Sequence, residues 1–181
     1  VANGVAFPAL NGTTTYTATA TGANGCSVSD QVIVNGLPTP NINGGGDQTV
    51  CAGESVVLYA TGGITYTWTN GVINNVPFVP TVSGNYTVSG TGGNGCVGQD
   101  VVNVTVNALP NAIASFIDPI TMVASPAGLS YQWINCTLNE NIAGAVDDTL
   151  AVTANGSYAV IVTNASGCSD TSDCIIVDKV G

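Results

Sequence analysis

The sequence repeats itself with a period of about seventy residues. Three tyrosines recur at intervals of 70 and 72 residues, and three cysteines recur at the same two intervals. The tyrosines are Tyr16, Tyr86 and Tyr158, and the cysteines are Cys26, Cys96 and Cys168. This period is too long for one rung of a solenoid and fits a small β-sandwich of about seven strands. The period therefore predicts an array of small sandwiches in tandem.

The middle copy shows the strand pattern most clearly. Residues 54–62 and 64–71 alternate apolar and polar side chains, which is typical of half-buried strands. Residues 85–91 and 100–106 are predicted to pair as a hairpin around a Gly-rich turn, and residues 76–84, with two prolines, to form short edge pieces. The abundance of small and β-branched residues and of turn formers also indicates strands. We therefore expect an all-β fold.

The repeats predict three domains of unequal completeness. Residues 39–110 form a complete repeat, and residues 111–181 form a complete variant repeat that aligns Trp133 with Trp68. Residues 1–38 match only the second half of a repeat. A half sandwich has an open edge and half a core, so we expect it to be completed by a longer array of repeats or by strand complementation from another chain. The partners expected are neighbouring repeats or copies of the chain itself.

The charge composition excludes several classes of function. The chain has 11 acidic residues, one basic residue (Lys179) and no histidine, for a net charge of -10. Nucleic-acid binding needs Lys and Arg against the phosphates, so we expect none. Histidine is the commonest general base and metal ligand, and no paired-carboxylate cleft is indicated, so no catalytic, cofactor or metal site is expected. Every apolar run is broken too early for a membrane span.

Two stretches carry a resemblance to a known class of repeats. The segment "TVCAGESVVLYATGGITYTWTNGVINNVPFVPTVSGNYTVSGTGGNGC" resembles the tandem Ig-like/PKD-like repeats of bacterial surface adhesins exported by the type IX system. The segment "YQWINC…ANGSYAVIVTNASGCSDTSDC" is similar to a variant repeat of those proteins. The resemblance implies tandem Ig-like antiparallel sandwiches with a non-catalytic, extracellular role at the cell surface, in an adhesin or filament. A carbohydrate- or protein-binding module of a larger secreted protein is the alternative.

The six cysteines are expected to form disulfides, because they lie in an acidic, apparently exported chain without a zinc pattern. Cys51 with Cys96 is the first expectation, since both belong to one repeat. Strand order argues against it, because the two cysteines would lie roughly 40 Å apart at ~3.3 Å per residue. The alternative joins Cys51 to Cys168 of the next repeat and leaves Cys136 with Cys174 as a local pair. Cys26 has no partner in either scheme.

The aromatic and acidic residues have structural explanations. Trp68 and Trp133 could be sugar-stacking platforms, but their strand alternation predicts core positions, as for the tryptophan of Ig sandwiches. The three repeated tyrosines are expected to pack in the same way. Asp147–Asp148 and the pair Asp170 and Asp173 are calcium candidates, but neither forms a complete loop of alternating ligands, so solvated turns are expected.

Glycans are the remaining surface chemistry that the sequence suggests. Residues 148–150, "DTL", resemble the O-glycosylation motif of these bacteria, which makes Thr149 a candidate acceptor. The sequence also contains six N-x-S/T triplets, many of which arise by chance in a chain rich in Asn and Thr. Their asparagines are Asn11, Asn85, Asn103, Asn135, Asn155 and Asn164.

Overall fold

The chain is all-β and consists of two compact units. The computed structural model describes residues 4–8 and 10–178. Within them the regular elements are strands, apart from one 3-10 turn. Unit 1 comprises residues 1–46, 57–78 and 85–103, and unit 2 comprises residues 47–56, 79–84 and 104–181. Both units take segments from the second repeat, and the proposed division at residues 38 and 110 stays a prediction.

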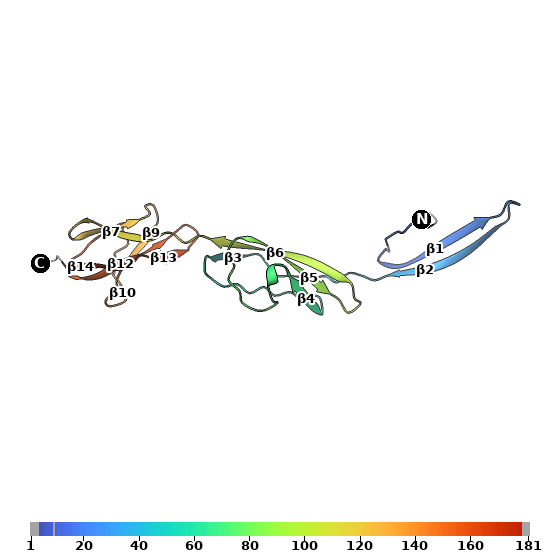
Figure 1. The fold of residues 1–181 in the computed structure, drawn as a ribbon, viewed down its shortest axis with the longest axis horizontal. Helices are drawn as coiled ribbons and strands as arrows, with labels where there is room; N and C mark the ends of the chain where they lie inside the picture. The colour runs from blue at the N-terminus through green and yellow to red at the C-terminus, as the bar shows by residue number, and fades with distance from the viewer. Residues whose placement is uncertain (1–3, 9, 179–181) are drawn as a thin grey trace. The chain divides into compact units, whose positions relative to one another are not determined.

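Unit 1 begins with a long antiparallel hairpin (Figure 1). Strands β1 (Gly12–Thr21) and β2 (Ser27–Gly36) pair over ten residues each, around a turn in which Gly25 has a φ of 79°. Phe7 packs its ring on Tyr16 with centroids 4.7 Å apart. The other elements of the unit are β4 (Thr65–Trp68), η1 (Thr69–Gly71), β5 (Gly84–Thr91) except its first residue, and the first part of β6 (Val97–Asn107).

The second repeat has a small core inside unit 1. Trp68, Val88 and Val102 are buried and close around Gly44. A Cβ on Gly44 would lie 2.9 Å from Val102 and 3.0 Å from Trp68, so a larger residue there would displace these buried side chains. The indole N–H of Trp68 donates to the side-chain oxygen of Asn74 at 3.1 Å, which satisfies the polar edge of a buried ring. The predicted core position of Trp68 is thus confirmed.

The expected strand at residues 54–62 differs from the prediction. Burial alternates there, with Val56, Leu58 and Ala60 buried, so the predicted inward face is correct. The segment contains no named strand, however, and has only isolated bridges, at Val56 and at Thr61, which pairs with Asn43. Its backbone groups have irregular partners instead: Ala60 N–H donates to the Asn74 side chain, and Leu58 C=O accepts from Asn75. Residues 76–83, expected as edge pieces, contain no named strand.

Unit 2 contains the third repeat as a sandwich of two sheets. One sheet has the order β11-β8-β7, and the other has β10-β9-β12-β13 with β14 also on β12. The strands are β7 (Ile113–Asp118), β8 (Thr121–Ser125), β9 (Ser130–Asn135), β10 (Glu140–Asn141), β11 (Thr149–Ala151), β12 (Gly156–Thr163), β13 (Ser169–Thr171) and β14 (Ile175–Val177). The unit also includes β3 (Gln48–Cys51), which pairs in parallel with the end of β6.

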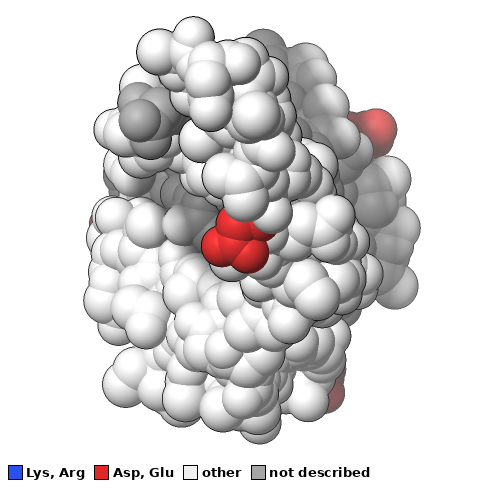
Figure 2. All heavy atoms as spheres, turned by 90° about the vertical axis from the view of Figure 1, so that its right-hand side faces the viewer, with Lys and Arg blue, Asp and Glu red and all other residues white. Residues whose placement is uncertain are grey.

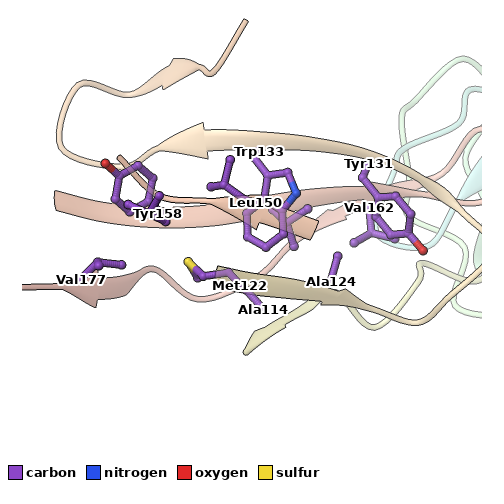
Figure 3. Packing of buried hydrophobic residues seen from close by; sticks show 11 residues of the cluster. Ala114, Met122, Ala124, Tyr131, Trp133, Leu150, Tyr158, Val162 and Val177 are labelled. Carbon is purple, nitrogen blue, oxygen red and sulfur yellow. The ribbon is translucent and has the colours of Figure 1, made fainter. Parts of the chain in front are cut away.

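Both sheets contribute to the core of the third repeat (Figure 3). Trp133 on β9 and Val162 on β12 face Met122 and Ala124 on β8. Trp133 is fully buried, and its indole N–H donates to the Asp147 carbonyl at 3.0 Å. The second tryptophan therefore also occupies its predicted core position, and the third repeat is an Ig-like antiparallel sandwich.

The described surface is poor in charge. On the face drawn in Figure 2, a few acidic side chains lie among uncharged ones. No helix among the described residues is long and apolar enough to cross a membrane. Those residues also contain no cluster of three or more His, Cys, Asp or Glu side chains that could hold a metal ion.

Candidate functional site: the junctions between repeats

A disulfide joins the second repeat to the third within unit 2. Cys51 is bonded to Cys168, with Cα atoms 5.6 Å apart and 117 residues between them in sequence. Cys51 ends β3 opposite Asn107 at the end of β6, and the N–H of Ala52 donates to the Asn107 carbonyl at 2.8 Å. The parallel pairing thus carries Cys51 to the place where the chain leaves the second repeat.

The loop before Cys168 contacts the linker from the other side. Asn164 donates its side-chain N–H to the Ala108 carbonyl at 2.8 Å. Its side-chain oxygen accepts from the N–H groups of Ser166 and Cys168 at 3.0 and 3.1 Å. Cys168 itself is fully buried. One asparagine therefore shapes the loop and holds it against the linker, which positions Cys168 for the bridge.

The structure decides between the two expected cysteine pairings. Cys51 with Cys96 is not formed, because Cys51 lies opposite the last residue of β6 while Cys96 precedes its first residue. An eleven-residue strand of about 3.3 Å per residue separates them, far beyond disulfide reach. Cys136 and Cys174 form a second bridge, with Cα atoms 6.3 Å apart. Cys26 and Cys96 are free thiols.

The first junction, inside unit 1, has a similar arrangement without the bridge. Asn94, in the turn before Cys96, donates its side-chain N–H to the Pro38 carbonyl at 2.8 Å. The Cys96 sulfur lies 3.9 Å from the Leu37 carbonyl oxygen. Cys96 is partly exposed, whereas Cys168 at the matching position is buried and bonded. The two junctions therefore share the loop-on-linker contact and differ at the sulfur.

The repeated tyrosines lie on the inner face of each repeat. Tyr86 and Tyr158 are buried, and Tyr16 is partly exposed in the hairpin. Tyr86 packs against Phe78 with ring centroids 5.3 Å apart, which repeats the contact of Tyr16 with Phe7. The packing role predicted for these rings is thus seen in the second and third repeats.

Two aspartates show a perturbed acidity with a local cause. The backbone N–H of Gly44, donating to Asp100 at 2.8 Å, lowers the pKa of that carboxyl, and the Val101 N–H adds to the effect. The N–H of Ile120 and the Thr121 hydroxyl lower the pKa of Asp118. Hydrogen bonds to the ionised form favour it. Both carboxylates are therefore held in the charged form that suits turn stabilisation.

The glycosylation candidates divide by exposure. Asn135 and Asn164 are partly buried, and Asn164 uses its amide N–H on the linker, so a glycan there would displace that contact. Asn103 donates its side-chain N–H to the oxygen of Asn85 at 2.9 Å. Modification of any of these residues stays a prediction. The exposed candidates are Asn11, Asn85, Asn103, Asn155 and Thr149.

A shallow depression with a mixed polar and apolar lining lies at one end of the third repeat. It has a volume of about 500 Å³ and is lined by Phe116 and Ile176, with the carboxylates of Asp118 and Asp178 beside them. Phe116 and Ile176 are exposed. An exposed aromatic ring next to carboxylates is the kind of surface that could bind a sugar, and sequence reasoning did not identify it.

Solved structures similar to the chain are tandem immunoglobulin domains. Sidekick-1 immunoglobulin domains 1–4 are 14% identical, with 88% of this chain and 56% of that chain covered and a TM-score of 0.38. The N-terminal Ig1-2 module of the Drosophila receptor protein tyrosine phosphatase DLAR is 13% identical, with coverages of 77% and 97% and a TM-score of 0.28.

A third similar structure comes from a bacterium. The Bacteroides ovatus protein SGBP-B of a mixed-linkage glucan utilization locus, solved with a mixed-linkage heptasaccharide, is 13% identical, with coverages of 74% and 43% and a TM-score of 0.26. The sequence matches no protein-family model and no curated protein.

Proposed function

We propose that the chain is a non-catalytic structural module of a secreted bacterial surface adhesin or extracellular filament. The observation that carries this proposal is the Cys51–Cys168 disulfide, which joins successive repeats across their linker. A flexible string of domains does not need such a bridge, whereas a semi-rigid stalk does. Disulfides also persist in oxidising compartments outside the cytoplasm.

The chemistry of the described residues supports this role. Buried side chains fill the sandwich cores, and the perturbed carboxylates stabilise turns. The surface, with few charges, suits repeated contact between modules and is consistent with a glycan coat at residues such as Thr149. The resemblance to repeats of type IX-secreted adhesins supports the same placement at the bacterial surface.

Immunogold electron microscopy tests the proposal. Antibodies against the chain should label fibres or a surface layer on intact cells of the organism that produces it. Pre-immune serum and cells lacking the gene are the controls. Label confined to the cytoplasm, or an even label in the culture fluid with none on cells, would contradict a surface structural role.

A sugar-binding module is the second candidate, and the depression at Phe116 is the observation that favours it. A glycan array probed with the chain should then give signals that Phe116→Ala abolishes. The control is Tyr59→Ala, which removes another exposed ring elsewhere in the chain. Signals that persist in the Phe116 variant would exclude the depression as the sugar-binding site. An array without signals would contradict sugar binding and leave the structural role as the remaining candidate.

A further inference from the structure

The β1–β2 hairpin presents an inner face on which Phe7, packed against Tyr16, is the one ring contact recorded among the described residues. The side chains of Tyr16, Ala18 and Val32 lie on one face, because alternate residues share a face and Tyr16 pairs with Val32. Val32 is 58% exposed, whereas Val88 and Val102 on the matching face of the second repeat are 0% exposed. This face borders a groove of about 840 Å³, along which Phe7, Tyr16, Ala18, Val28 and Val32 lie, and Asp30, opposite Ala18, adds a carboxylate to the same face.

The second repeat shows what occupies the same edge. There β3 pairs in parallel with β6, from Gln48 opposite Val104 to Cys51 opposite Asn107. The residues Asn107 to Pro110, "NALP", recur as "NGLP" at Asn35 to Pro38. Aligning the two motifs places Asn35 on Asn107 and Val32 on Val104. The part of β2 that corresponds to the β3-paired part of β6 therefore runs from Val32 to Asn35. A β3-like strand there would place its cysteine opposite Asn35.

The other edge of the hairpin, formed by β1, corresponds to an edge that is paired with a strand in both other repeats. In the second repeat Trp68 on β4 lies opposite Val88, and in the third repeat Trp133 on β9 lies opposite Val160. Both partners follow the repeated tyrosine by two residues. The matching residue in the hairpin is Ala18. A strand carrying a tryptophan is therefore the element that this edge accepts in both other repeats.

The free thiol of Cys96 lies at the first junction in the position that Cys168 has at the second. At the second junction the Cys51 of the β3 strand bonds to Cys168, whose loop rests on the linker at Ala108. At the first junction the Cys96 loop rests on the linker at Pro38, and its sulfur lies 3.9 Å from the Leu37 carbonyl. A cysteine opposite Asn35 would thus arrive beside Cys96 as Cys51 arrives beside Cys168.

We propose that the hairpin is a docking site for a β-strand segment with the pattern of residues 46–71, and that a cysteine of this segment bonds to Cys96. The inference deepens the proposed structural role and rests on it, since the partner would be another module of the assembly. The two thiols lose two protons and two electrons to a low-molecular-weight disulfide, which is reduced to two thiols as the new S–S bond forms.

The test uses the full chain and a synthetic peptide of residues 46–71, which carries Cys51 and Trp68. Incubated with oxidised and reduced glutathione, the mixture should give one peptide per chain, and non-reducing mass spectrometry should find it bonded to Cys96. A peptide with the same composition in scrambled order is the control. Equal attachment to Cys26, or equal yield with the scrambled peptide, would overturn the proposal.

Two neighbouring substitutions separate docking from thiol reactivity. Val32→Asp places a charge on the inner face, where the docked peptide would bury it, and should weaken peptide binding about tenfold or more, measured by fluorescence anisotropy. Ile33→Asp places the same charge on the opposite face, 62% exposed, and should leave binding within about twofold. Cys96→Ser should bind the peptide without cross-linking it. Equal effects of the two aspartates would exclude the inner face as the docking surface.

Two further outcomes have distinct meanings. If the chain alone dimerises with rising concentration and Val32→Asp prevents it, the groove binds a second copy of the chain and the proposal of a docked strand segment is wrong. If the peptide fails to bind while antibodies still label surface fibres, the docking proposal is wrong and the proposed structural role is still supported.

Discussion

Removing the junction disulfide should destabilise unit 2 by an amount that follows from chain connectivity. Cys51→Ala is the suitable change, because it leaves Cys168 as a buried thiol that packs as a small apolar side chain. Cys51 and Cys168 are 117 residues apart, but the Cys136–Cys174 bridge shortens the loop. The shortest covalent path runs from Cys51 to Cys136, crosses that bridge and returns from Cys174 to Cys168.

That path contains about 90 residues, for which the chain-entropy relation gives about 4.6 kcal/mol of stabilisation at 25 °C. The variant should therefore lose up to this free energy of unfolding in unit 2. Urea unfolding followed by tryptophan fluorescence measures it, and a Trp68→Phe background leaves Trp133 as the reporter for the unit.

The control is Cys26→Ala, which removes an exposed free thiol and should leave the midpoint unchanged. A loss below about 1 kcal/mol in Cys51→Ala would refute the reasoning, since the bridge would then impose little constraint on the unfolded chain. A loss seen only in a Trp133→Phe background, where Trp68 is the reporter, would show that the bridge stabilises unit 1 instead of unit 2.

Two further substitutions test the second repeat. Gly44→Ala should cost about 1–3 kcal/mol in urea unfolding, because its Cβ would press on buried side chains, whereas Gly46→Ala has open space and should cost far less. Asp100→Asn should flatten the acid dependence of stability. Its folded pKa is lowered, so its contribution is present above the ordinary value of about 3.9 and is lost as pH falls through the folded pKa.

Urea midpoints between about pH 5 and pH 2 measure that acid dependence. Asp30→Asn, at the matching position of the first repeat, is the control for the general loss of negative charge. If Asp100→Asn and the unsubstituted chain lose stability in parallel over this range, the hydrogen bond from Gly44 does not stabilise the folded carboxylate.

Sequence alternation predicted which side chains face inward. Trp68 and Trp133 are buried where the period-two pattern placed them, and so are Val56, Leu58 and Ala60. The same pattern did not reveal that residues 54–62 lack a ladder, because their hydrogen bonds go to Asn74 and Asn75 in a distant loop. Alternation reports the environment of side chains and not the partners of the backbone.

The cysteine pairing shows the same limit. Spacing within one repeat favoured Cys51 with Cys96, yet the bridge forms between repeats. The outcome depends on β3 lying parallel to β6, which brings Cys51 to the far end of that strand. The direction of a strand relative to its neighbour is a tertiary property, and no local motif in the sequence predicts it. Strand-order reasoning was able to offer the Cys51–Cys168 alternative but not to choose it.

The position of the junction disulfide also determines how far the chain can be drawn out. A pull applied at the two termini passes through the Cys51–Cys168 bond, so residues 52–167 bear no tension while that bond is intact. The oxidised chain can then extend to about 230 Å even when every domain is open, against about 630 Å after reduction. The redox state would thus set the reach of the module under load.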